Sequence, residues 1–116
     1  MDGKREERGV HNPKVVDLID FDPDRGEVVL SMIEERPWGS VPDQIKQIED
    51  KLNSYLAYVL AGHLEREYPQ YAGKRVAFQL ECAQPPGRQQ DAFLTAVANF
   101  AEGENIRFAV VVRKEA

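Results

Sequence analysis

Residues 75–83 read Arg-Val-Ala-Phe-Gln-Leu-Glu-Cys-Ala, and the alternation of larger apolar side chains with small or polar ones decides the fold. Because successive side chains of a strand point to opposite faces, a period of two predicts a strand with one buried face. The face expected to point inward carries Val76, Phe78, Leu80 and Cys82. Gly73 precedes the segment and Pro85-Pro86-Gly87 follows it, and both breaks are typical of strand ends.

A helical period replaces the strand period on both sides of this segment. On the N-terminal side, apolar residues recur at spacings of three and four until Gly62. This stripe consists of Ile45, Ile48, Leu52, Tyr55, Leu56, Val59 and Leu60. Ser40 and Asp43 resemble a capping box at the start of that helix. On the C-terminal side, residues 89–101 predict a second helix, and its expected buried stripe is Phe93, Ala96, Val97 and Phe100.

Three more strand-like segments complete the pattern, at residues 15–21, 27–34 and 106–113. The first two flank Asp22-Pro23-Asp24-Arg25-Gly26, whose turn chemistry predicts an antiparallel hairpin. A connection through a helix can return a strand parallel to its predecessor, so we expect a mixed sheet. The order strand–strand–helix–strand–helix–strand predicts an α+β fold. Its architecture is a two-layer sandwich, a four-stranded mixed sheet with two helices on one face.

Length and composition indicate one soluble domain. The chain has 116 residues, of which 42% are hydrophobic, and a net charge of −5. Residues 1–13 lack periodicity and predict a flexible leader, whereas residues 14–116 predict a single α+β domain. The acidic balance disfavours nucleic acid as a partner, and no apolar run reaches the ~20 residues of a membrane helix. Because Cys82 is the only cysteine, we expect a cytoplasmic protein.

The outward register of the sheet mixes polar and apolar side chains. Its polar members are Ser31, Gln79, Glu81, Arg107 and Arg113, and its apolar members are Val29, Ile33, Ala77, Ala109 and Val111. Apolar residues that cluster on an exposed face indicate a binding surface. The expected partner is a second copy of the chain, in a homodimer, or an unidentified protein. The function that follows is that of a non-enzymatic interaction domain.

No catalytic, cofactor-binding or metal-binding constellation is recognisable in the sequence. Asp20, Asp22 and Asp24 alternate like calcium ligands. A helix–loop–helix calcium loop, however, wants glycine at its sixth position, which here is Arg25. The two histidines lack the spacing of a zinc site, and Cys82 falls on an inward register, where a cysteine acts as a small apolar residue. Enzymatic activity stays open but is not favoured, and no cofactor is expected.

The loop after the second strand is the main candidate for a functional surface. It holds the only tryptophan, Trp38, beside Arg36 and two acids. A loop tryptophan is a common interface anchor, so Glu35, Arg36 and Trp38 form a candidate interaction surface. One alternative is that Trp38 closes the edge of the core while Arg36 pairs with an acid. Another is a small ligand-binding domain or enzyme that uses Arg36 and the acids near this loop.

Four short motifs follow one another along the chain. They are Val16-Asp17-Leu18-Ile19, Gly26-Glu27-Val28-Val29-Leu30, Arg36-Pro37-Trp38 and Lys51-Leu52-Asn53-Ser54-Tyr55-Leu56. In this order they resemble a family of small bacterial domains of unknown function, over residues 12–113. The resemblance implies a bacterial, cytoplasmic protein, and it assigns no activity or site residue.

Overall fold

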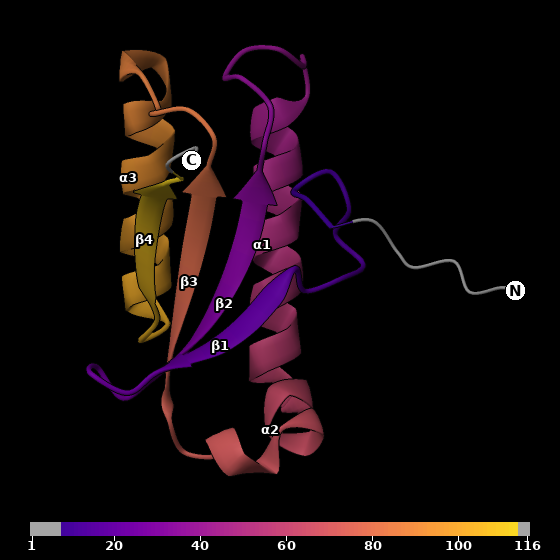
Figure 1. Ribbon diagram of the computed structural model, residues 1–116, viewed down its shortest axis with the longest axis vertical. Coiled ribbons are helices and arrows are strands. Elements are labelled where there is room, and N and C mark those ends of the chain that lie inside the picture. The colour runs from indigo at the N-terminus through magenta and orange to yellow at the C-terminus, as the bar shows by residue number, and fades with distance from the viewer. Residues whose placement is uncertain (1–7, 114–116) are drawn as a thin grey trace, which may run out of the picture.

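The structure, a computed structural model, describes residues 8–113 and consists of one sheet with helices (Figure 1). In chain order its elements are β1 (Leu18–Asp22), β2 (Glu27–Glu34), α1 (Gln44–Leu60), α2 (His63–Glu67), the 3-10 turn η1 (Pro69–Tyr71), β3 (Arg75–Cys82), α3 (Arg88–Gly103) and β4 (Arg107–Val112). The short helix α2 and the turn η1 lie between α1 and β3. The predicted succession of strands and long helices is confirmed.

The four strands form one mixed sheet in the order β1-β2-β3-β4. β1 and β2 form the expected antiparallel hairpin, and Gly26 in its turn has a φ of 64°, a conformation that suits glycine. β2 pairs with β3 in parallel, and β3 pairs with β4 in parallel. Both long helices lie behind the sheet in Figure 1, so one face is covered and the other is not. The predicted α+β sandwich is therefore confirmed.

The core lies between the covered face of the sheet and the two long helices. The strands contribute Val28, Leu30, Met32, Phe78, Leu80 and Cys82, each at most 1% exposed. The helices contribute Ile48, Leu52 and Tyr55 from α1 and Leu94, Val97 and Ala101 from α3. The rings of Tyr55 and Phe78 meet edge to face, with centroids 5.7 Å apart. The inward register predicted for residues 75–83 is therefore correct.

The predicted buried stripe of helix α3 is correct for Val97, which is buried, and for Phe93, which packs against the core, but it is wrong for Ala96 and Phe100. Leu94 and Ala101 are buried, whereas Phe100 is 49% exposed and Ala96 is exposed. Apolar residues cover more than one side of this helix, so its sequence alone does not select the side that packs on the sheet.

The predicted capping box is also absent at the start of α1. The helix begins at Gln44, and the Ser40 hydroxyl instead donates a hydrogen bond to the carbonyl oxygen of Pro37 at 2.7 Å. The helix follows a turn that is fixed by other contacts, so this serine stabilises the loop rather than the helix.

The packed part of the chain begins before residue 14. Val10 is 1% exposed and belongs to the core, and its amide donates to the carbonyl oxygen of Ile33 at 2.9 Å. Residues 9–13, which the sequence analysis assigned to a leader, are thus attached to the end of β2. Residues 1–7 of the expected leader lie outside the described residues. Within residues 8–113, every helix is too short or too polar to cross a bilayer.

Candidate functional site

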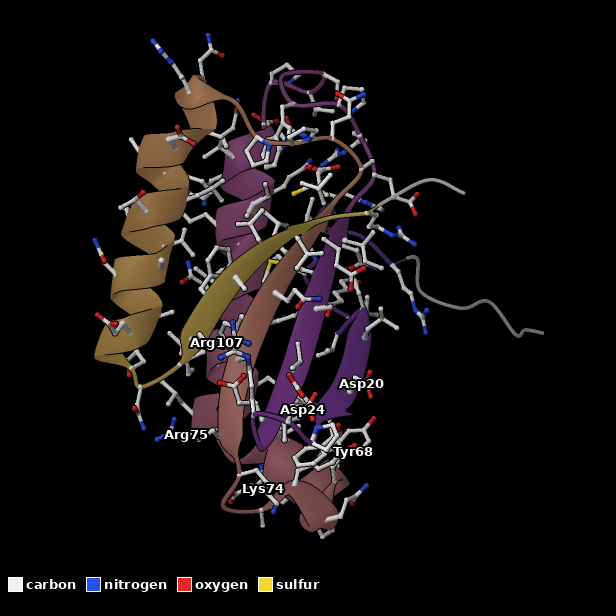
Figure 2. All side chains as sticks on the ribbon, turned by 60° about the vertical axis from the view of Figure 1, so that its left-hand side comes forward. Asp20, Asp24, Tyr68, Lys74, Arg75 and Arg107 are labelled. Atoms are coloured by element: carbon white, nitrogen blue, oxygen red, sulfur yellow. The ribbon has the colours of Figure 1, made fainter. Side chains whose placement is uncertain are left out.

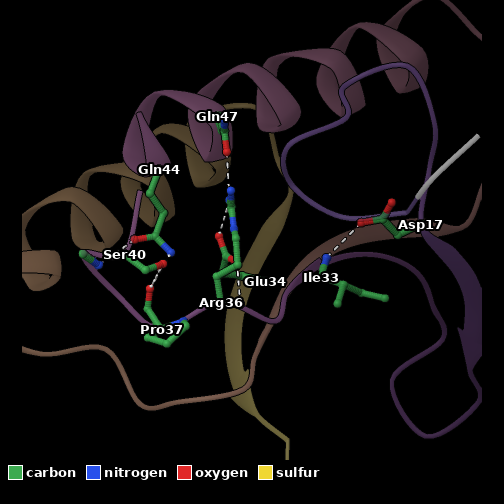
Figure 3. A network of polar contacts seen from close by, with 9 residues as sticks. Asp17, Ile33, Glu34, Arg36, Pro37, Ser40, Gln44 and Gln47 are labelled. Carbon is green, nitrogen blue, oxygen red and sulfur yellow. Dashed lines mark hydrogen bonds and ion pairs between the residues drawn. The ribbon is translucent and has the colours of Figure 1, made fainter. Parts of the chain in front are cut away.

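The loop between β2 and α1 contains Arg36, which binds a buried carboxylate (Figure 3). Glu34 is 1% exposed, and Arg36 donates to it from Nε to Oε1 at 2.9 Å and from Nη2 to Oε2 at 2.7 Å. Arg36 Nη2 also donates to Oε1 of Gln47 at 2.8 Å. Burial alone would raise the pKa of Glu34, but the hydrogen bonds from Arg36 and Gln44 outweigh it and hold this pKa below its ordinary value.

Trp38 lies over the same end of the core. Its indole Nε1 donates to the carbonyl oxygen of Gln84 at 2.9 Å, and its side chain is half-buried against the core. Gln44 supports the loop from α1, because its Oε1 accepts from the amide of Gly39 at 2.7 Å. Glu35 points elsewhere and faces Arg113, with 3.5 Å between the charged atoms. Arg36 and Trp38 therefore have the contacts of a structural lid, and Glu35 does not share them.

A buried ionic network, which was not predicted from the sequence, lies beneath β1. Lys51 and Asp17 have fully buried side chains, and Lys51 Nζ lies 2.9 Å from Oδ1 of Asp17. The same ammonium donates to the carbonyl oxygens of Asn12 at 2.5 Å and Val15 at 2.7 Å. Asp17 in turn accepts from the amides of Gly9 and Ile33, each at 2.9 Å. Each buried charge thus has several partners, as a charge removed from water requires.

Tyr55 joins this network to the sheet. Its hydroxyl donates to the carbonyl oxygen of Ser31 at 2.6 Å and accepts from the amide of Asp17 at 2.8 Å. Burial lowers the pKa of Lys51, and the Asp17 carboxylate opposes this effect only in part. The network attaches residues 9–17 to α1 and to β2. Spacing places Lys51 within the buried stripe, because it stands three residues after Ile48 and four before Tyr55, but spacing does not identify Asp17 as its partner.

The face of the sheet that the long helices do not cover is called the open face below. Its side chains come from alternate strand positions: Leu18, Asp20 and Asp22 of β1, Glu27, Val29, Ser31 and Ile33 of β2, Arg75, Ala77, Gln79 and Glu81 of β3, and Arg107, Ala109 and Val111 of β4. Leu18 and Val111 are 38% and 40% exposed. The apolar residues predicted for the outward register do share this face.

Opposite charges occupy the two edges of the open face. Asp20 and Asp22 lie on the edge strand β1, Arg107 lies on the edge strand β4, and Arg75 lies on the neighbouring strand β3. Figure 2 labels Asp20, Arg75 and Arg107, and the charge of Asp22 also acts on Arg107 of the same chain. Arg107 forms a forked ion pair with the buried Glu27, in which Nη2 is 2.8 Å from Oε1. This hydrogen bond is the main reason why the pKa of Glu27 is lowered. The acidic edge and the basic edge thus lie on the same surface.

Two hollows mark these edges. A hollow of about 340 Å³ at the foot of β3 and β4 is lined by Arg25, Arg75 and Arg107, together with Glu27 and Glu102. A second hollow of about 450 Å³ beside β1 is lined by Leu18, Asp20, Asp22 and Val29, among others. The first is rich in arginine and the second carries two aspartates, so they differ in the charge of the ligand they favour.

The remaining candidates from the sequence are placed as follows. Cys82 is completely buried, and burial raises the pKa of its thiol to about 11, far from the range of a reactive thiolate. Asp22 forms a local turn by accepting from the amide of Asp24 at 3.0 Å. In the part of the chain that the structure describes, no three or more His, Cys, Asp or Glu side chains gather in a manner suited to a metal ion.

Fold and site together define a small α+β domain with a mixed sheet, one face of which is open. The model of the family of unknown function DUF6572 matches residues 8–114, so the chain belongs to this family. The expected resemblance to a family of uncharacterised domains is therefore confirmed. Comparison with curated proteins and with solved structures found no match to this chain.

Proposed function

We propose that this chain is an interaction domain that pairs with a second copy of itself through the open face of the sheet. The observation that carries the proposal is the arrangement of that face, which has an acidic edge, a basic edge and small or apolar side chains between them. A surface that carries both charges at opposite edges is complementary to itself. A homodimer is therefore the occupant that this surface fits best.

The middle of the open face suits contact with another sheet. Val29, Ile33 and Ala109 are half-buried and apolar, whereas Ala77 between them is already buried within the chain. Exposed Leu18 and Val111 extend this apolar area to β1 and β4. Sheets that pack face to face interdigitate such side chains at a separation of about 10 Å. The sheet of the second copy would cover the open face, as the two long helices cover the opposite face.

The size of the face indicates how strong the dimer should be. Four strands at a spacing of about 4.8 Å, each about six residues long, give a footprint of roughly 400 Å². A standard stable interface buries roughly 800 Å² on each partner. We therefore expect a dimer with a dissociation constant in the micromolar range, which forms and separates readily.

Sedimentation of the full chain over a range of concentrations tests the proposal. The wild-type chain should change from monomer to dimer at micromolar concentrations, and Leu18→Lys or Val111→Lys should weaken this association about tenfold or more, because a charge would enter the interface. Leu60→Lys is the matched control, since Leu60 is 61% exposed but lies on α1, and it should leave the dimer unchanged. A wild-type chain that stays monomeric throughout would contradict the proposal.

We also infer that the protein works in the bacterial cytoplasm. The buried free thiol of Cys82 and the sequence motifs that resemble a bacterial family support this inference. Fractionation of a bacterial host that carries the natural gene tests it, and recovery of the protein from the periplasm would contradict it.

A further inference from the structure

We propose that the arginine-lined hollow at the foot of the open face binds Asp20 and Asp22 of the second copy, around a two-fold axis that runs parallel to the strands. The inference rests on the proposed function and adds its orientation and its main polar contact. It assigns a carboxylate as the ligand of the hollow and names the residues that supply it.

The hollow contains the guanidinium of Arg107, which Glu27 holds in position and which still has donors for a ligand. The Nε of Arg107 donates to both carboxylate oxygens of Glu27, at 3.1 Å to Oε1 and 3.2 Å to Oε2. Its Nη2 donates to Oε1 at 2.8 Å. Within residues 8–113, its Nη1 makes no hydrogen bond, so donors remain for a carboxylate. An arginine that is already oriented loses less conformational entropy when it binds such a group.

Arg25 and Arg75 add positive charge beside Arg107, and the charge of Arg25 already acts on Glu27 of its own chain. Both side chains are exposed and line the hollow beside Arg107. Over the described part of the chain, neither forms an ion pair or a side-chain hydrogen bond. The lining of the hollow therefore has three arginines against Glu27 and Glu102, and the charge of Asp22 in the same chain also acts on Arg107, in a chain whose net charge is −5. An excess of positive charge in an acidic chain favours an acidic segment as ligand.

The acidic edge presents such a segment in a fixed conformation. Oδ1 of Asp20 accepts from the amide of Phe21 at 2.8 Å, and Oδ1 of Asp22 accepts from the amide of Asp24 at 3.0 Å. Among residues 8–113, the second oxygen of each aspartate accepts no hydrogen bond, so it can accept one from another donor. Two carboxylates, two residues apart on one strand, thus point from the same face.

The strand register places these aspartates and arginines at matching heights. Asp20 pairs with Val29, Val29 with Ala77, and Ala77 with Arg107, so the four residues form one row across the sheet. A two-fold axis that runs parallel to the strands, above the middle of the sheet, places the open faces of two copies against each other. The row of one copy then lies opposite the same row of the other copy, in reverse order. Asp20 of one copy then faces Arg107 of the other, and Val29 faces Ala77.

The neighbouring row supports the same arrangement. It contains Asp22, Glu27 and Arg75, again across β1, β2 and β3. The same axis brings Arg75 of one copy opposite Glu27 of the other, with Asp22 near the hollow. A two-fold axis perpendicular to the strands would instead place β1 on β1, which keeps the aspartates away from the arginines. Of these two axes, only the one parallel to the strands brings the aspartates of each copy to the arginines of the other, once at each edge of the interface.

Two variants and their mixture test this arrangement. Asp20→Arg reverses one edge, and Arg107→Glu reverses its facing partner; the second chain also carries Glu27→Gln, so that no like charge is buried beside residue 107. Each variant alone should self-associate about tenfold more weakly than the wild type, because like charges face each other at both contacts. An equimolar mixture should form heterodimers nearly as strong as the wild-type dimer. In the heterodimer one contact keeps its natural charges and the other has them exchanged.

Controls and contrary outcomes keep this test separate from that of the proposed function. Arg88→Glu and Glu49→Arg change exposed charges on the helical layer, so neither the variants nor their mixture should alter association. A dimer that responds to Leu18→Lys but not to the charge reversals, or a mixture that stays monomeric, would overturn this arrangement and keep the open face as the interface. If titration with inorganic phosphate shows micromolar binding to a chain that stays monomeric, the hollow is a small-anion site and the inference is wrong.

Discussion

On the covered side of the sheet, both members of the Lys51–Asp17 ion pair are fully buried, whereas on the open side Arg107 is 37% exposed above Glu27. The buried pair is surrounded by backbone partners from residues 9–17, and it positions the chain. The half-exposed pair keeps donors toward solvent and can bind a second group. Charge therefore organises the fold on one face of the sheet and remains available for recognition on the other.

The largest effect should come from breaking the buried pair. Asp17→Ala leaves the Lys51 ammonium buried without its carboxylate, so we expect a loss of about 3–5 kcal/mol in the free energy of unfolding. Urea titration measures this loss. Asp50→Ala is the matched control, because the Lys46–Asp50 pair has side chains 66% and 47% exposed and should leave the free energy of unfolding nearly unchanged. A loss below about 1 kcal/mol for Asp17→Ala would show that the buried network does not hold the fold.

The two faces should also differ in their response to truncated apolar side chains. Leu80 is 0% exposed on the covered face of β3, so Leu80→Ala should cost about 2–5 kcal/mol through lost burial and the cavity left behind. Val111→Ala on the open face should change stability by about 0.5 kcal/mol or less in dilute solution, where the chain is monomeric. Thermal or urea unfolding measures both. Equal losses at the two positions would mean that the open face is packed in the monomer.

The smallest expected effect concerns acid. The hydrogen bond from Arg107 lowers the pKa of Glu27 in the folded state, so this carboxylate contributes stability above its unfolded pKa, about 4.3. That stability is lost as the pH falls through the lower folded pKa. Glu27→Gln should remove a pH-dependent contribution of about 1 kcal/mol, discounted for the exposure of Arg107. Unfolding at a series of pH values compares the two chains, and an identical acid dependence would contradict the assignment.

Much of the sheet could be predicted from the sequence because its strands obey a strict period of two. Residues 75–83 fixed the inward register, and the outward register gave Val29, Ala77 and Arg107 their correct face. The helices were harder. Helix α3 has apolar residues on several sides, and the choice of Leu94 and Ala101 over Phe100 depends on contacts with the sheet that a helical period does not describe.

The polar networks were the least predictable part. Lys51 lies in an apolar stripe, where a lysine reads as a boundary residue until its distant partner Asp17 is known. Val10 likewise joins the core through contacts of its backbone and of the neighbouring Gly9, whose amides donate to the carbonyl oxygen of Ile33 and to Asp17, respectively. Lys51 and Asp17 are 34 positions apart, and short-range patterns do not identify such a partner.

The place of β4 at the end of the sheet has a consequence for handling this protein. One long side of β4 has no neighbouring strand in the described sheet, and residues 108–112 read Phe-Ala-Val-Val-Val, without charge or proline. Such a segment is prone to stack with copies of itself into fibrillar aggregates when the chain unfolds. Arg107 and Arg113 flank it and oppose this process as charged gatekeepers.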